Sequence, residues 1–125
     1  KFLIARLIKL FKERKLNSIE QIYNLNISGD FSHAEDICYG IYKLSITKKK
    51  IDKIILSSGE RFYINDIIDY LEKKFNLQIR KDKIKDNSNF QPLGSNLVAR
   101  KLLNYKVKKT PIDACNELIK IICKA

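Results

Sequence analysis

A stripe of apolar side chains over residues 64–75 constrains the fold more than any other feature of this 125-residue chain. Ile64, Ile67, Ile68, Leu71 and Phe75 recur at the spacing that places side chains on one face of an α-helix. Most of the residues between them are charged or polar. The pattern therefore predicts an amphipathic helix whose apolar face packs on a core.

Two positions carry clear helix-start signals. Ser32, followed three residues later by Glu35, has the spacing of a capping box, in which the hydroxyl and the carboxylate satisfy backbone amides reciprocally. Thr110 precedes Pro111 at the first helical position, where the missing N–H costs nothing, and Asp113 adds an acidic first turn. The predicted helices are 2–16, 32–44, 64–75, 97–103 with a cap at Asn96, and 110–123.

Short strands are predicted between the helices. Residues 53–57 form a β-branched run that leads into a Ser-Ser-Gly turn, which is typical of a buried strand. Residues 19–25 and 78–81 are predicted as further short strands, and 86–96 as a surface loop rich in Asn, Ser and Gly. This order predicts the α/β class, as a small α+β-like lobe, because the strands are too few and too short for a complete doubly wound sheet.

Length and composition favour one lobe over residues 1–125, since 45% apolar content suffices for one modest core. Cys38, Cys115 and Cys123 form no CxxC pair and predict buried thiols in a reducing, cytoplasmic setting. No apolar run approaches the ~20 residues of a membrane span, so no membrane partner is expected. The chain starts at Lys1 and contains no methionine, which leads us to expect a piece of a larger protein.

The net charge of +11 makes polyanion binding an alternative hypothesis. Basic residues occur in every segment, however, and the aromatic side chains fall mostly on apolar faces instead of forming a stacking platform. Nucleic acid is therefore not the favoured partner. A stand-alone basic module would be identified by an affinity that falls steeply with salt.

Few residues of this chain suggest catalysis. His33 is the only histidine, so a metal site with two histidines is excluded. We expect His33 to anchor a loop to a helix by hydrogen bonds, with proton transfer as the alternative. Gly29, Gly40, Gly59 and Gly94 are scattered, so the chain has neither a P-loop nor a GxGxxG motif. No residue is assigned a catalytic, cofactor-binding or metal-binding role.

The order of several motifs resembles one enzyme family. Residues 24–36, NLNISGDFSHAED, resemble the segment NLDAKRDWGHAKD of GDP-mannose 4,6-dehydratases, and more loosely that of other extended short-chain dehydrogenase/reductases acting on nucleotide sugars. The remaining similarities are collinear: the first helix to ITRAV, 54–60 to a strand ending in ATGE, 64–71 to VREFVEL, 90–92 to FRP, 99–105 to AKEKLGW, and 110–113 to TSFEE.

The resemblance implies the C-terminal, substrate-binding part of an NAD(P)-dependent nucleotide-sugar dehydratase or epimerase, inactive as an isolated segment. The Rossmann domain that binds NAD or NADP and the catalytic residues would lie upstream of Lys1, and the whole enzyme would be a homo-oligomer. Asn24, Asn26, Arg61 and Arg100 would bind the nucleoside diphosphate sugar. A structural corner would be made by Asp30, Ser32, His33, Glu35 and Asp36.

Two departures bear on the substrate. Gly29 and Gln91 stand where the family has arginines, and an arginine fork is the natural bidentate partner of a diphosphate. A relative with a degenerate pocket is therefore a third hypothesis. Gly29→Arg separates the two enzyme-like hypotheses. It should tighten nucleotide-sugar binding or leave it unchanged in a working lobe, and it should create no affinity in a degenerate one.

Overall fold

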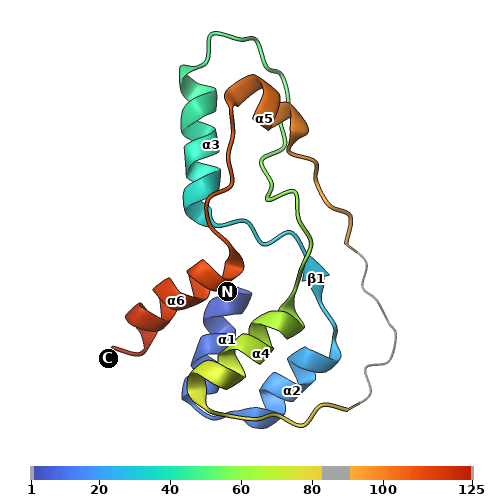
Figure 1. Cartoon of the computed structure of the whole chain (residues 1–125), viewed down its shortest axis with the longest axis vertical. Coiled ribbons are helices and arrows are strands. Elements are labelled where there is room, and N and C mark those ends of the chain that lie inside the picture. Colours follow the sequence, from blue (N-terminus) through green and yellow to red (C-terminus); the bar gives the residue numbers. More distant parts are fainter. Residues whose placement is uncertain (1, 83–90, 125) are drawn as a thin grey trace.

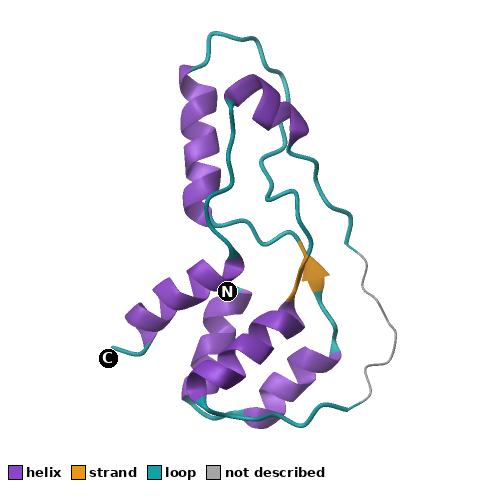
Figure 2. Ribbon diagram, viewed as in Figure 1, coloured by secondary structure: helices purple, strands orange, loops and turns teal. Residues whose placement is uncertain are grey.

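Six helices and a two-stranded sheet make up the part of the chain that the structure, a computed structural model, describes: residues 2–82 and 91–124 (Figures 1 and 2). The elements are α1 (Leu3–Lys12), α2 (Leu16–Asn24), β1 (Ser28–Gly29), α3 (Ala34–Ile46), β2 (Phe62–Tyr63), α4 (Ile64–Phe75), α5 (Leu97–Leu103) and α6 (Pro111–Ile122). This confirms the predicted class, a small, mainly helical α/β lobe. The motif at 90–92 and the loop at 86–96 lie partly outside the described residues.

The helices form two ends of an elongated molecule (Figure 1). At one end α1 packs against α2, α4 and α6, and at the other α3 packs against α5. The antiparallel ladder between β1 and β2 lies between the ends, with Ser28 opposite Tyr63 and Gly29 opposite Phe62. The backbone amide of Ile64 extends this pairing by donating to the carbonyl oxygen of Ile27 at 2.9 Å.

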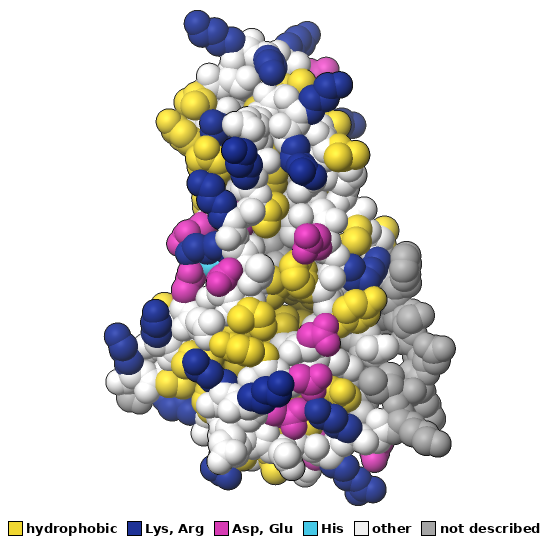
Figure 3. Space-filling model, in the orientation of Figure 1, with side chains coloured by type: hydrophobic (Ala, Val, Ile, Leu, Met, Phe, Trp, Pro, Cys, Tyr) yellow, Lys and Arg dark blue, Asp and Glu magenta, His cyan; other side chains and the backbone are white. Residues whose placement is uncertain are grey.

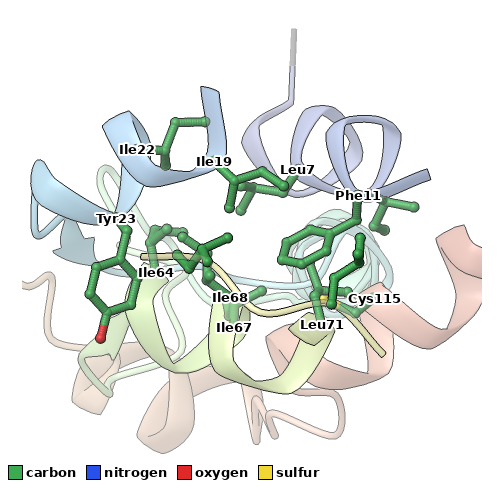
Figure 4. Packing of buried hydrophobic residues seen from close by; sticks show 13 residues of the cluster. Leu7, Phe11, Ile19, Ile22, Tyr23, Ile64, Ile67, Ile68, Leu71 and Cys115 are labelled. Atoms are coloured by element: carbon green, nitrogen blue, oxygen red, sulfur yellow. The ribbon is translucent and has the colours of Figure 1, made fainter. Parts of the chain in front are cut away.

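The larger core belongs to the four-helix end (Figure 4). Its buried side chains include the predicted stripe of α4, and the rings of Phe11 and Phe75 stack with centroids 5.7 Å apart. The hydroxyl of Tyr70 on α4 donates to the side-chain oxygen of Asn116 on α6 at 2.6 Å. The apolar face of α4 thus packs on a core, as its periodicity predicts. It joins α4 to α1, α2 and α6.

Two sequence predictions about the first 25 residues are wrong. Residues 2–16 do not form one helix, because Arg14 has a left-handed backbone (φ 54°) and separates α1 from α2. Residues 19–25 are helix instead of strand. Their buried members, Ile19, Ile22 and Tyr23, have the i, i+3, i+4 spacing of a helix face that packs on α1 and α4.

The other two predicted strands are also wrong, since neither 53–57 nor 78–81 joins a ladder among the described residues. The capping box at Ser32 is wrong as well. The side chain of His33 caps α3 by accepting from the amide of Glu35 at 3.1 Å, while the Ser32 hydroxyl donates to Asp30 at 2.9 Å. The N-cap residue of α3 is thus His33, one residue later than predicted.

The thiols are only partly as predicted. Cys115 is buried, and burial raises the pKa of its thiol to about 11. Cys38 and Cys123 are exposed, which contradicts the prediction of three buried thiols. Cys38 lies on the outward side of α3, and Cys123 follows the last turn of α6.

The capping box at Thr110 is confirmed: its hydroxyl accepts from the amide of Asp113, and the Asp113 carboxylate accepts from the Thr110 amide at 2.8 Å. We predict that Thr110→Ala lowers the free energy of unfolding by about 1 kcal/mol, the usual cost of a lost helix cap. Urea denaturation monitored by circular dichroism measures it. Thr110→Ser keeps the hydroxyl and should retain most of the stability; an equal loss in both variants would contradict the capping role.

Candidate functional site

A corner between β1 and α3 holds three distant segments of the chain. Its first side chain, Asp30, accepts hydrogen bonds from the Ser32 hydroxyl and from both the amide and the hydroxyl of Ser58. These bonds fix the turn before β2 against the end of β1. Gly59 completes that turn with a left-handed backbone (φ 75°), which glycine adopts at little cost.

The second side chain of the corner is His33, whose ring links α3 to α6. Because Nδ1 accepts from the Glu35 amide, Nε2 carries the hydrogen and donates to Glu117 at 2.9 Å. Glu117 also receives a hydrogen bond from the ammonium group of Lys109, which pairs with Glu35 at 3.0 Å. The hydrogen bonds from Lys109 and His33 lower the pKa of Glu117, and the bond to Glu117 raises the pKa of Lys109.

The third side chain, Asp36, is only 4% exposed. Its carboxylate accepts from the backbone amides of Lys108 and Lys109 at 3.0 to 3.2 Å, so it fixes the segment between α5 and α6. A buried carboxylate needs such donors, because an unpaired one would lose its hydration without compensation. The resemblance implied that these residues form a structural corner. Their contacts give each of them a structural setting.

Two of the candidate binding residues, Arg61 and Asn26, lie next to the ladder. The guanidinium group of Arg61 donates to the hydroxyl of Ser28 at 3.0 Å and to the carbonyl oxygen of Gln91 at 2.6 Å. Asn26 has a left-handed backbone (φ 47°), and its side-chain oxygen accepts weakly from Asn65 at 3.4 Å. The oxygen of the buried Asn65 side chain has no hydrogen-bond partner among the described residues.

Gly29 and Gln91, the two positions that depart from the family motif, lie side by side in this region. A Cβ atom at Gly29 would lie 3.9 Å from the Cβ of Gln91, an ordinary van der Waals contact. The structure therefore brings together two positions that are 62 residues apart in the sequence. It also has room for the start of a side chain at 29.

The four predicted substrate-binding residues do not all meet. Asn24 ends α2 close in sequence to Asn26, and Arg61 precedes β2, so these three belong to the ladder region. Arg100 lies on α5, at the α3 and α5 end of the molecule and away from the ladder (Figure 1). Sequence reasoning missed Ser58, Glu117 and Asn65. Each acts through a contact between segments far apart in the chain, which no local pattern reports.

Two hollows lie away from the ladder. An apolar hollow of about 560 Å³ opens between α1 and α6, where Phe2, Ile4, Leu118 and Ile121 line it and the His33 to Glu117 bond borders it. A second hollow, of about 600 Å³, follows α4 and contains the ammonium group of Lys81. That group pairs with two carboxylates of α4, those of Asp69 and Glu72, at 2.7 Å each.

The described residues hold no group of three or more His, Cys, Asp or Glu side chains that could bind a metal ion. Nor does this part of the chain contain a helix long and apolar enough to cross a bilayer. Its glycines serve separate structural purposes. Gly40, for example, lets Leu56 and Tyr105 approach the backbone of α3 closely. Nothing in this arrangement provides the glycine-rich turn that a dinucleotide pyrophosphate requires.

Comparison with solved structures gives a similar fold. The Bordetella bronchiseptica enzyme WbmF, solved in complex with NADH, matches 78% of this chain with a TM-score of 0.65 and 18% sequence identity. The match covers 31% of WbmF, so this chain spans about a third of that enzyme's length. At this identity the likeness concerns the fold alone. No protein-family model and no curated protein matches the sequence.

We predict that Asp36→Asn lowers the free energy of unfolding by about 1 to 3 kcal/mol, because the amide replaces a buried, charged acceptor of two backbone N–H groups. Thermal or urea denaturation measures this loss. Asp52→Asn, at an exposed position, is the matched control and should change stability by no more than about 0.5 kcal/mol. Equal effects at both positions would contradict the role of Asp36.

The lowered pKa of Glu117 predicts a pH dependence. A carboxylate with a lowered folded-state pKa adds stability above its ordinary pKa of about 4.5, and this is lost as the pH falls through the folded-state value. The difference in unfolding free energy between the natural chain and Glu117→Gln should therefore shrink as the pH falls below about 4.5. Lys109→Ala should weaken this dependence. A difference that stays constant from pH 7 to pH 3 would contradict it.

Proposed function

We propose that this chain is the substrate-binding lobe of an NAD(P)-dependent enzyme that acts on nucleoside diphosphate sugars, a dehydratase or an epimerase. The observation that carries the proposal is the meeting of Asn26, Arg61 and positions 29 and 91 at one ladder. The motif order of that enzyme family assigns nucleotide contacts to these same segments. The similarity of fold to part of WbmF, an enzyme solved with NADH, supports the same assignment.

In this proposal Arg61 takes the place of the family arginines at positions 29 and 91. Its guanidinium group is held by Ser28 and by the backbone of Gln91, the two segments from which those arginines would project. A guanidinium group presents a planar set of donors that matches the oxygens of a diphosphate. Asn26 and the buried oxygen of Asn65 offer polar contacts beside it. The redox cofactor would be bound by the remaining two-thirds of the enzyme.

The charge distribution favours one second candidate, polyanion binding at the α3 and α5 end. Lysine and arginine side chains are scattered over this end in Figure 3, whereas acidic side chains are more frequent at the middle and toward the four-helix end. The two segments 43–53 and 97–109 contain ten basic residues and a single acidic one. This candidate predicts an affinity for RNA or heparin that falls steeply with salt. The nucleotide-sugar proposal instead predicts binding at the ladder.

We predict that titrating the ¹⁵N-labelled chain with GDP-mannose or a UDP-sugar shifts the amide resonances of residues 26, 28, 29 and 61. Arg61→Ala should weaken this binding about 10-fold or more, the worth of one charge-assisted hydrogen bond. Arg80→Ala is the matched control, because Arg80 is an exposed arginine paired only loosely with Asp82 at 3.3 Å. If both variants weakened binding equally, the loss would come from the change in net charge and not from a contact made by Arg61.

The substitution Gly29→Arg tests the remaining hypothesis of a degenerate pocket. The backbone at 29 is not left-handed and leaves room for a Cβ, so the variant should fold. We expect tighter or unchanged binding of GDP-mannose in the same titration. No shift at the ladder with either the natural chain or the variant would contradict the proposed function.

A further inference from the structure

The antiparallel pairing of β1 with β2 gives the ladder two faces. Side chains directly opposite one another lie on the same face, and successive side chains along a strand lie on opposite faces. Ser28 is opposite Tyr63, and Gly29 is opposite Phe62. One face of the ladder therefore carries Ser28 and Tyr63, and the other carries Gly29 and Phe62.

Residues just beyond the ladder continue the face of Tyr63. Asn65 follows Tyr63 by two positions, and its amide nitrogen donates to the side-chain oxygen of Asn26 at 3.4 Å. Arg61 precedes Tyr63 by two positions, and its guanidinium group donates to the hydroxyl of Ser28 at 3.0 Å. Both bonds join side chains of the two paired segments. We call these five residues the polar face of the ladder: Asn26, Ser28, Arg61, Tyr63 and Asn65.

Tyr63 lies at the centre of the polar face. Its side chain is 45% exposed. Within residues 2–82 and 91–124, its hydroxyl makes no hydrogen bond and its ring makes no aromatic or cation–π contact. Phe2 and Tyr42 are also exposed, but Phe2 precedes α1 and Tyr42 lies on α3, so neither belongs to the ladder. The polar face thus holds a ring whose π-surface can stack on a planar group of a ligand.

A second feature of the polar face is the side chain of Asn65. It is only 8% exposed, and its oxygen accepts no hydrogen bond within the described part of the chain. A buried acceptor without a donor costs free energy, and native folds leave few of them. The amide nitrogen makes only the long bond to Asn26, so rotation about the soft terminal torsion costs little and turns the oxygen toward the polar face. The face therefore offers an acceptor to a ligand that brings an N–H donor.

We propose that Tyr63 stacks on the base of a nucleoside diphosphate sugar, with Asn65 accepting a hydrogen bond from an N–H group at the edge of the base and Arg61 binding the diphosphate. This inference rests on the proposed function and adds to it the residues that bind the base. Arg61, Tyr63 and Asn65 succeed one another at intervals of two residues, about 7 Å in an extended strand. A nucleotide likewise carries its anionic phosphates and its planar base at opposite ends, so one molecule can meet all three side chains.

Tyr63→Ala tests the stacking directly. It should weaken the binding of UDP and of GDP to the ¹⁵N-labelled chain by about 5-fold to 100-fold, because each loses a stacked base. Inorganic pyrophosphate has no base, so its affinities for the natural chain and for the variant should agree within about 2-fold. Unchanged binding of UDP and GDP, or an equal loss for pyrophosphate, would overturn the proposal and leave the proposed function standing. If the natural chain binds neither UDP nor GDP, the proposed function fails, and this inference fails with it.

Two further variants separate the ring from the rest of the side chain and from its position. Tyr63→Phe keeps the ring without the hydroxyl and should recover the affinity of the natural chain to within about 3-fold. Tyr42→Ala removes a tyrosine that is 56% exposed on α3, and it should leave the affinity for UDP unchanged. The amide resonances of Ile67 and Ile68, which are buried in the four-helix core, report whether each variant is folded. Equal losses in Tyr63→Ala and Tyr63→Phe, or in Tyr63→Ala and Tyr42→Ala, would overturn the stacking role.

The side-chain amide of Asn65 provides a separate readout in the same titration. Its N–H resonances should shift when UDP is added. N3-methyl-UDP, in which a methyl group replaces the donor N–H of the base, should bind about 5-fold more weakly. The side-chain amide of Asn116 is the control, because its oxygen accepts from Tyr70 between α4 and α6. Equal shifts at Asn65 and Asn116, or N3-methyl-UDP binding as tightly as UDP, would overturn the contact between Asn65 and the base.

Discussion

The corner between β1 and α3 is the constraint on which the rest of the structure depends. Within seven residues, the side chains of Asp30, His33 and Asp36 each hold a segment from another part of the chain: the turn before β2, helix α6, and the backbone between α5 and α6. The contacts of His33 and Asp36 satisfy polar groups that would be costly to leave unpaired, because both side chains are largely buried, whereas the contacts of Asp30 are exposed. Because the three bonds diverge, the corner sets where both ends of the molecule lie relative to the ladder.

The corner also explains how the α3 and α5 end keeps its position relative to the rest of the molecule although its core is small. Only three buried hydrophobic residues stabilise the packing of α3 on α5, so apolar burial contributes little there. Asp36 adds bonds to Lys108 and Lys109, and Lys109 in turn joins Glu35 to Glu117 on α6. Polar contacts of this kind specify geometry more than they add stability, since the ion pairs are partly exposed. We therefore expect α3 and α5 to open before the four-helix core does.

The parts of the fold that the sequence predicted correctly are those decided within a few residues. The stripe of α4 and the cap at Thr110 depend on spacing and on neighbouring amides, and both are as predicted. The failures come from competition with distant groups. His33, which is bonded to Glu117 of α6, caps α3 in place of Ser32, and residues 19–24 become helix because α1 and α4 bury their i, i+3, i+4 face. The segment 53–57 shows the reverse case, in which a local signal for a strand has no ladder partner among residues 2–82 and 91–124.

The sequence indicated which segments form the candidate site, but it did not indicate how they are placed relative to one another. The motif at 24–36 indicated Asn26, and the absence of arginine at 29 and 91 was visible in the sequence. That Arg61 lies between these segments depends on the pairing of β1 with β2, which turns residue 61 toward Ser28 and brings residue 91 alongside. A guanidinium group presents its donors in a planar fork that matches phosphate geometry. A site that loses both arginines can thus keep a positive charge at the same place, provided that the ladder holds its register.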